Sequence, residues 1–222
     1  WEQYPEDIRI ILVDDGSPEP AEPVVRALAS PALLKHMELY RITVDIPWAR
    51  STARNLGAVQ AQTDHIVHLD IDHVLPAVCA HRLLPFTPDD PTWYRFSRFR
   101  RGKADATRQK DALPRNSPYG PVHPHIDSYL IRRDLFLQAP YNEAYNGILG
   151  GGSAFLATMA LRAPVTLLPG QIFLEVYTRD VIPDASVTTL ERNPSAYATR
   201  RREIARQGAP DPQHIVRLPW ER

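Results

Sequence analysis

The sequence has little of what several classes of protein depend on. Its 222 residues contain one cysteine, Cys79, which excludes an intramolecular disulfide framework and a multi-cysteine metal site. We expect Cys79 to lie in the core. Charge of one sign is not in excess either, because 26 Lys and Arg residues balance 26 Asp and Glu residues. This balance argues against nucleic acid or an anionic membrane as a partner.

Long hydrophobic runs are also missing. No run approaches the length of a transmembrane helix, and residues 1–5 do not form a signal peptide, so we expect no transmembrane segment and a cytoplasmic location. The 22 prolines are scattered along the chain and do not form a linker. With 43% hydrophobic residues, the chain can bury one sizeable core, and we predict a single domain over residues 1–222.

What is present is an alternation of strand and helix patterns. Apolar runs at 8–13, 37–44 and 65–69 predict strands, and they are separated by a helix at 23–28 and by a second helix that Ser51 and Thr52 could cap. This order predicts an α/β fold with a doubly wound, mostly parallel sheet and helices on both faces. After about residue 92 the pattern weakens, and it predicts an exposed-edge strand at 94–99, strands at 165–168 and 172–176, and a basic helix at 195–207.

Acidic residues follow two of the predicted strands. Asp14 and Asp15 come after the first strand, and Asp70 and Asp72 come after the third. Ligands of such sheets bind beyond the carboxyl ends of the strands. Two carboxylates separated by one residue form a compact oxygen site that suits Mn²⁺ or Mg²⁺ and leaves coordination positions open for phosphate. The alternative interpretation is a pair of solvated acids in a turn.

Several motifs occur together in the order of one known family. These are the Val-Asp-Asp-Gly-Ser turn at 13–17, the Ala-Arg-Asn helix at 53–55, the Asp-Ile-Asp motif at 70–72, and segments at 131–136 and 141–147. Together they resemble the GT-A glycosyltransferases, particularly family two and its galactosyltransferase-like relatives. The resemblance runs from residue 1 to about 180. It implies a GT-A fold with a nucleotide-binding half at 1–90, a smaller acceptor-side half at 91–190, and a C-terminal helix and tail at 191–222.

The resemblance also implies roles for individual residues in binding UDP or a UDP-sugar. Asp15 would accept a hydrogen bond from the uracil imide, although either it or Asp14 could instead cap the following helix. Arg54, or Arg50 one turn earlier, would reach the base or the phosphates; Arg54 could instead pair with Asp64 on the surface. Asp70 would contact the ribose or share the metal, and Asp72 would be the direct metal ligand. The acceptor would be a saccharide, a peptide or a small molecule.

Two departures from the family pattern bear on function. The family normally begins with an earlier strand and helix, so either the chain extends before Trp1 or the nucleotide pocket lacks one wall. Relatives also carry a Gly-Glu-Asp type sequence near residue 151, whose carboxylate acts as general base, whereas Gly152 and Ser153 stand there in this sequence. Glu143 is a weak substitute for this base, and we favour a structural role for it.

Three functional hypotheses therefore stay open. The first is an active, metal-dependent transferase that uses a UDP-sugar, and the second is a weak or inactive homologue that still binds the nucleotide. The third is a phosphatase of the haloacid-dehalogenase type, in which Asp70 would be the nucleophile and Asp72 the acid/base. A His-x-His-x-Asp run at 123–127 is a further possible metal-ligand set, against a role in a loop or the acceptor site.

Overall fold

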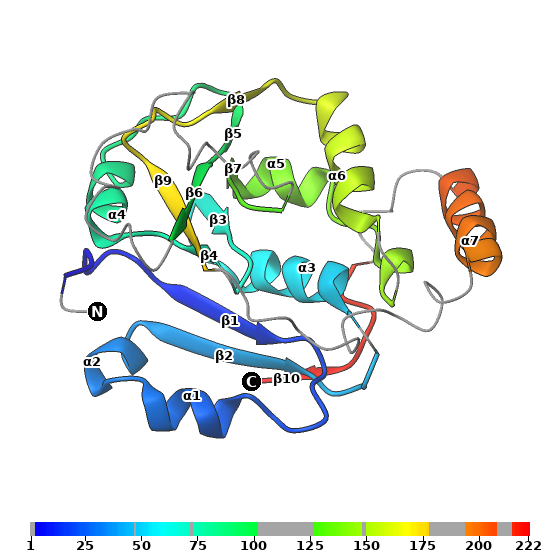
Figure 1. The fold of residues 1–222 in the computed structure, drawn as a ribbon, viewed down its shortest axis with the longest axis horizontal. Coiled ribbons are helices and arrows are strands. Elements are labelled where there is room, and N and C mark those ends of the chain that lie inside the picture. The colour runs from blue at the N-terminus through cyan, green and yellow to red at the C-terminus, as the bar shows by residue number, and fades with distance from the viewer. Residues whose placement is uncertain are drawn as a thin grey trace.

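A computed structural model describes residues 3–46, 48–71, 73–101, 127–147, 150–177, 194–207 and 215–222 (Figure 1). The first sheet joins the N-terminal part of the chain to its C-terminal end. Strand β1 (Ile10–Asp14) runs parallel to β2 (Met37–Ile42), and β10 (Trp220–Glu221) pairs antiparallel with the other edge of β2. The connection from β1 to β2 carries the short helices α1 (Glu22–Leu28) and α2 (Pro31–Leu34).

Helix α3 (Arg50–Gln60) packs against β1 through a glycine. A methyl group built on Gly57 would make ordinary van der Waals contacts of 3.8 Å with Val13 and 3.9 Å with Ile11, so this glycine faces β1 with room for a small side chain. Leu56 is fully buried in the same layer, with Tyr40 and Ile42 of β2. The close packing fixes the height of α3 above the sheet and thereby the position of its polar face.

The second sheet has the order β3-β7-β5-β8. Its strands are β3 (His65–His68), β7 (Tyr129–Arg132), β5 (Trp93–Arg95) and β8 (Val165–Leu167). Helices α5 (Arg133–Gln138) and α6 (Gly151–Ala160) pack against it around a core of aromatic side chains. Within this core the rings of Tyr129, Tyr141 and Phe155 stack on one another, and Trp93 meets Tyr129 edge to face.

The third sheet has the order β4-β9-β6. It contains β4 (His73–Val74), β9 (Phe173–Tyr177) and β6 (Ser97–Arg101), with α4 (Ala77–Leu83) beside it. Cys79 of α4 is fully buried there, as expected. The remaining described elements are the 3-10 helix η1 (Glu143–Tyr145) and α7 (Pro194–Gln207), which packs Ile204 against Tyr145. No helix of the described segments is long and apolar enough to cross a membrane.

The sheet architecture differs from the predicted one. The described strands form three small mixed sheets instead of one doubly wound, mostly parallel sheet, and β3 pairs antiparallel with β7 rather than with β1. The predicted edge strand at 94–99 is also wrong, because β5 lies inside the second sheet and only β6 is at an edge. The partners of β3 and β4 come from residues after 92, and pairing over such sequence distances leaves no local periodicity from which it could be predicted.

The first three strands and the helices at 23–28, from residue 51 and at 195–207 are confirmed, with shifts of one or two residues at their ends. The prediction that Ser51 or Thr52 caps α3 is wrong. The helix begins at Arg50 after Ala49, whose side chain makes no capping bond, and the backbone N–H groups of Ser51 and Thr52 donate to Asn146 Oδ1 at 3.1 and 3.3 Å. A distant side chain therefore caps this helix.

Candidate functional site

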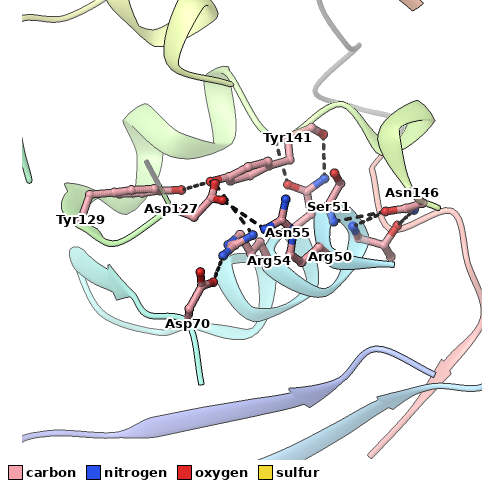
Figure 2. Close-up of polar contacts among 10 residues, drawn as sticks. Arg50, Ser51, Arg54, Asn55, Asp70, Asp127, Tyr129, Tyr141 and Asn146 are labelled. Carbon is pink, nitrogen blue, oxygen red and sulfur yellow. Dashed lines mark hydrogen bonds and ion pairs between the residues drawn. The ribbon is translucent and has the colours of Figure 1, made fainter. Parts of the chain in front are cut away.

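The polar face of α3 carries two arginines one turn apart. Arg50 and Arg54 are four residues apart and therefore project from the same side of the helix (Figure 2). Their exposure differs: 30% of the Arg50 side chain is exposed, against 9% for Arg54. One face of one helix thus presents one buried guanidinium and one that reaches solvent.

A buried carboxylate lies beside both arginines. Asp127, only 1% exposed, has Oδ2 3.3 Å from Arg50 Nη1 and Oδ1 3.9 Å from Arg54 Nη1. The Tyr141 hydroxyl donates to Asp127 Oδ1 at 2.7 Å and accepts a bond of 3.2 Å from the Tyr129 hydroxyl. Burial and the neighbouring Asp127 charge raise the pKa of Tyr141, so this hydroxyl stays protonated and remains a donor. Two arginines and a tyrosine hydroxyl thereby fix the position of the Asp127 carboxyl group.

Asp70 completes the surroundings of Arg54. Arg54 Nη2 donates to Asp70 Oδ1, and the guanidinium carbon lies 5.3 Å from the centre of the Tyr141 ring. Burial lowers the pKa of Arg54, but Tyr141, Asp127 and Asp70 raise it by more, so the side chain stays charged. Arg54 therefore contacts Asp70 and Asp127, which is not the surface partnership with Asp64 that the sequence left open.

The two aspartates after β1 have different surroundings. Asp14 Oδ1 accepts from the backbone N–H groups of Gly16 and Ser17 at 3.2 and 2.8 Å, and its Oδ2 accepts from that of Ala21 at 2.9 Å. Gly16 has φ +98°, and a side chain there would collide with the carbonyl of Val44, so this turn requires glycine. Asp14 is thus the acid that holds the turn before α1.

Asp15, the next residue, is partly buried. Burial and then the adjacent Asp14 charge raise the pKa of Asp15, while Arg50 and Arg54 lower it by a smaller amount. The contacts that the α3 arginines make are with Asp70, two residues beyond β3, and with the buried Asp127. The role of Asp15 in binding a nucleotide stays a prediction.

Asn55 of α3 and Asn146 connect this helix to the segment 141–147. Asn55 Nδ2 donates to the Tyr141 carbonyl and Asn55 Oδ1 accepts from the Tyr141 N–H, both at 3.0 Å. Asn146 accepts from the first N–H groups of α3 and donates to Thr52 Oγ1 at 2.6 Å. The sequence motifs at 53–55 and 141–147 contained both asparagines, but nothing local indicated that the two segments bind each other.

The Glu143 carboxylate is fully engaged in structural hydrogen bonds. Its Oε1 accepts from Asn55 Nδ2 at 2.8 Å and from the Val216 N–H at 2.6 Å, and its Oε2 accepts from the Arg217 N–H at 3.0 Å. These bonds join α3, η1 and the C-terminal segment 215–222. Because both of its oxygens are used in contacts between distant parts of the chain, the structure supports the structural role favoured from the sequence.

Gly152 faces Asp127 directly. A methyl group built on this glycine would lie 2.5 Å from Asp127 Oδ1 and 2.9 Å from Oδ2. The space where residue 152 would project a side chain is therefore filled by the Asp127 carboxylate. Sequence reasoning noticed the missing acid at 152 but not this arrangement, because Asp127 comes from a segment 25 positions away in the printed sequence.

The proposed metal ligands are only partly within the described structure. Asp72 lies outside the described residues, as do His123 and His125 of the His-x-His-x-Asp run. Among the residues that are described, no three His, Cys, Asp or Glu side chains gather as a metal site. Asp70 offers carboxylate oxygens of the kind that Mn²⁺ and Mg²⁺ prefer, and its side chain is 20% exposed beside Arg54.

Trp48, next to α3, has an unusual backbone. Its φ is +58°, in the left-handed region that a bulky side chain rarely adopts, at a cost of about 1–2 kcal/mol. Its carbonyl accepts a bond of 3.1 Å from the Gly147 N–H. In this conformation the ring lies 5.2 Å from the Arg50 guanidinium carbon.

The fold and the site together define an α/β protein with an acid-and-arginine cluster where two strands end, an arrangement suited to a nucleotide. A family model for glycosyl transferase family 2 matches residues 1–146, a span that contains every residue of the cluster. The chain belongs to this family. A search of curated proteins finds no match. Family membership supports the GT-A fold class, and it gives no support to the phosphatase hypothesis.

Proposed function

We propose that the chain binds a UDP-sugar and transfers the sugar to an acceptor with the help of a divalent cation. The observation that carries this proposal is the meeting of Asp70 and Asp127 with the two α3 arginines at one place. Membership of a glycosyltransferase family supports a nucleotide-sugar as donor. The acceptor is a saccharide, a peptide or a small molecule.

Each residue of the cluster has a chemical role in this proposal. Asp15 accepts the uracil imide hydrogen, and the α3 arginine face neutralises the diphosphate through charge-assisted hydrogen bonds. Asp70 contacts the ribose or shares the cation with Asp72, which is its direct ligand. A bound Mn²⁺ or Mg²⁺ supplies Lewis-acid stabilisation of the leaving diphosphate. Asp127, Tyr141 and Asn55 keep the arginine face in position.

Calorimetric titration with UDP tests this function. We expect UDP to bind wild-type protein in the presence of Mn²⁺ and only weakly in chelator, because a cation held by Asp70 and Asp72 would offset the charge of the diphosphate. Asp72→Ala should remove the Mn²⁺ dependence, and Asp15→Asn should weaken UDP by roughly tenfold through the lost imide bond. Asp7→Asn, the same charge change at an exposed position, is the matched control. Equal affinity with Mn²⁺ and in chelator would count against the site.

A second function, nucleotide-sugar binding without efficient turnover, is favoured by a specific observation. Both carboxylates near the start of α6 are engaged: Glu143 in three hydrogen bonds, and Asp127 with two arginines and Tyr141. Both carboxylates thus serve as partners of other protein groups and not as open bases facing an acceptor. Release of UDP from UDP-sugars, dependent on Mn²⁺ and lost in Asp72→Ala, would reject this second function.

A further inference from the structure

We propose that the two arginines of α3 have separate roles: Arg50 binds the diphosphate, held in place by Trp48 and Asp127, and Arg54 is an internal counter-ion. This inference rests on the proposed function, because it gives the two arginines of the same site different roles. Trp48 and Asp127 are positioning residues that act through Arg50.

The Arg54 guanidinium is surrounded by other side chains of the protein. Its Nη2 bonds Asp70, its Nη1 lies near Asp127, and the Tyr141 ring lies against the guanidinium. With 9% of its side chain exposed, it has little surface to offer a ligand. Its charge balances buried carboxylates, which would otherwise be costly to keep ionised.

Arg50 has the opposite character. Its one ion pair among the described residues joins Nη1 to Asp127 at 3.3 Å, and 30% of the side chain is exposed. A guanidinium has five N–H donors in a fixed plane, so Nε and Nη2 remain available for phosphate oxygens.

Trp48 and Asp127 together restrict a side chain that would otherwise be flexible. The Trp48 ring lies 5.2 Å from the Arg50 guanidinium carbon, and the ring reaches that position through the left-handed backbone at residue 48. The second contact of Arg50 is with Asp127. The Tyr141 hydroxyl holds the Asp127 carboxyl group, which fits in its place because residue 152 is glycine. A strained backbone that serves a ligand-binding side chain is a recurring feature of functional sites.

The test compares uridine with UDP, because only UDP carries the diphosphate. In a constant Mn²⁺ buffer, we expect Arg50→Gln to weaken UDP by roughly tenfold to a hundredfold and to change uridine affinity by less than about twofold. Trp48→Gly permits the left-handed backbone but removes the ring, and it should weaken UDP by about two- to fivefold with uridine unchanged. Trp48→Phe should restore most of that loss.

Double variants test whether Trp48 and Asp127 act through Arg50. A single variant of Arg54 tests its role as an internal counter-ion. In the Arg50→Gln background, Trp48→Gly and Asp127→Asn should have no further effect on UDP. Arg54→Gln should mainly lower thermal stability, since it leaves Asp70 and Asp127 without their shared cation.

Two results would overturn the division. One is a Trp48→Gly effect on UDP that persists without Arg50. The other is an Arg54→Gln protein of unchanged stability that loses UDP affinity as Arg50→Gln does. Wild-type protein that binds UDP no better than uridine would instead reject the proposed function itself.

Discussion

His68, the last residue of β3, is surrounded by aromatic rings. Its imidazole stacks on Phe136 at 4.8 Å and lies 5.1 Å from the Tyr129 ring, and its Nε2 is buried without a hydrogen-bond partner. Burial, and then the Arg54 charge, lowers the pKa of His68 to about 3. The histidine is thus neutral in the folded protein at every pH at which the protein is expected to work.

This depressed pKa predicts an acid-sensitive stability. Between about pH 6.5 and pH 3 the unfolded chain binds a proton at this histidine and the folded chain does not, so stability falls as the pH falls through that window. The contribution is at most ~1.4 kcal/mol per pH unit. His68→Phe should reduce the slope of unfolding free energy against pH, measured by urea unfolding at pH 7, 6 and 5. The exposed His65 of the same strand, changed to Gln, is the control, and an unaltered slope in His68→Phe would contradict the assignment.

Asp14 has the acid-side counterpart of this behaviour. Burial raises the pKa of Asp14, but bonds from the backbone N–H groups of Ala21, Ser17 and Gly16 lower it below its ordinary 3.8. Its stabilising contribution is therefore present at neutral pH and is lost as the pH falls below that value. At the scale of single residues, Asp14 and Asp15 thus differ in the direction of their pKa shifts, because backbone donors outweigh burial at Asp14 and burial dominates at Asp15.

Among the elements, α3 depends most on residues far from it in sequence. A helix leaves its first N–H groups without intrahelical partners, and Asn146 accepts two of these from a position more than 90 residues later. This cap also sets the register of Arg50 and Arg54 against Asp127. The segment that contains Asn146 therefore lies next to α3.

We expect Asn146→Ala to lower stability by about 1 kcal/mol, the usual cost of losing a helix cap. Asn146→Asp keeps the acceptor for the Ser51 and Thr52 N–H groups and should lose less, although it gives up the bond to Thr52 Oγ1. Thermal unfolding and hydrogen exchange of the first turn of α3 measure both variants. Equal losses in the two variants would mean that the Thr52 bond, and not the cap, is the stabilising contact.

On the scale of the whole molecule, the C-terminal segment 215–222 ties the first sheet to the site. β10 extends the sheet at β2, and Glu143 receives the Val216 and Arg217 N–H groups while also accepting from Asn55 of α3 (Figure 1). Val216 has a left-handed backbone with φ +58°, which orients its N–H toward Glu143. One carboxylate thus joins three parts of the chain.

Glu143→Gln tests this junction against the catalytic alternative. An amide can accept through only one atom, so we expect a loss of about 1–3 kcal/mol in stability and faster hydrogen exchange over 215–222. Any UDP-sugar turnover should keep its maximal rate when measured well below the unfolding temperature. Glu38→Gln, which removes an exposed ion pair to Arg222, is the control and should cost less than about 1 kcal/mol. A stable Glu143→Gln protein without turnover would return Glu143 to a catalytic role.

The sequence alone determined the local features of this protein. The apolar runs placed β1, β2 and β3, the turn residues ended them, and so the acids at 14–15 and 70 had to follow strand ends. Several of the family motifs lie within the same stretch, and the N-terminal part of the chain was therefore the better predicted part. These features depend on residues close together in the chain, where periodicity and turn chemistry act directly.

Tertiary structure alone decided how those features combine. It divided the strands into three mixed sheets, brought Asp127 and Tyr141 to the arginines of α3, and engaged Glu143 with the C-terminal segment. It also distinguished Asp14 from Asp15 and Arg50 from Arg54, which the sequence presents as near equivalents. Such choices depend on burial and on partners dozens of residues away, and the free energy of those contacts exists only once the chain is folded.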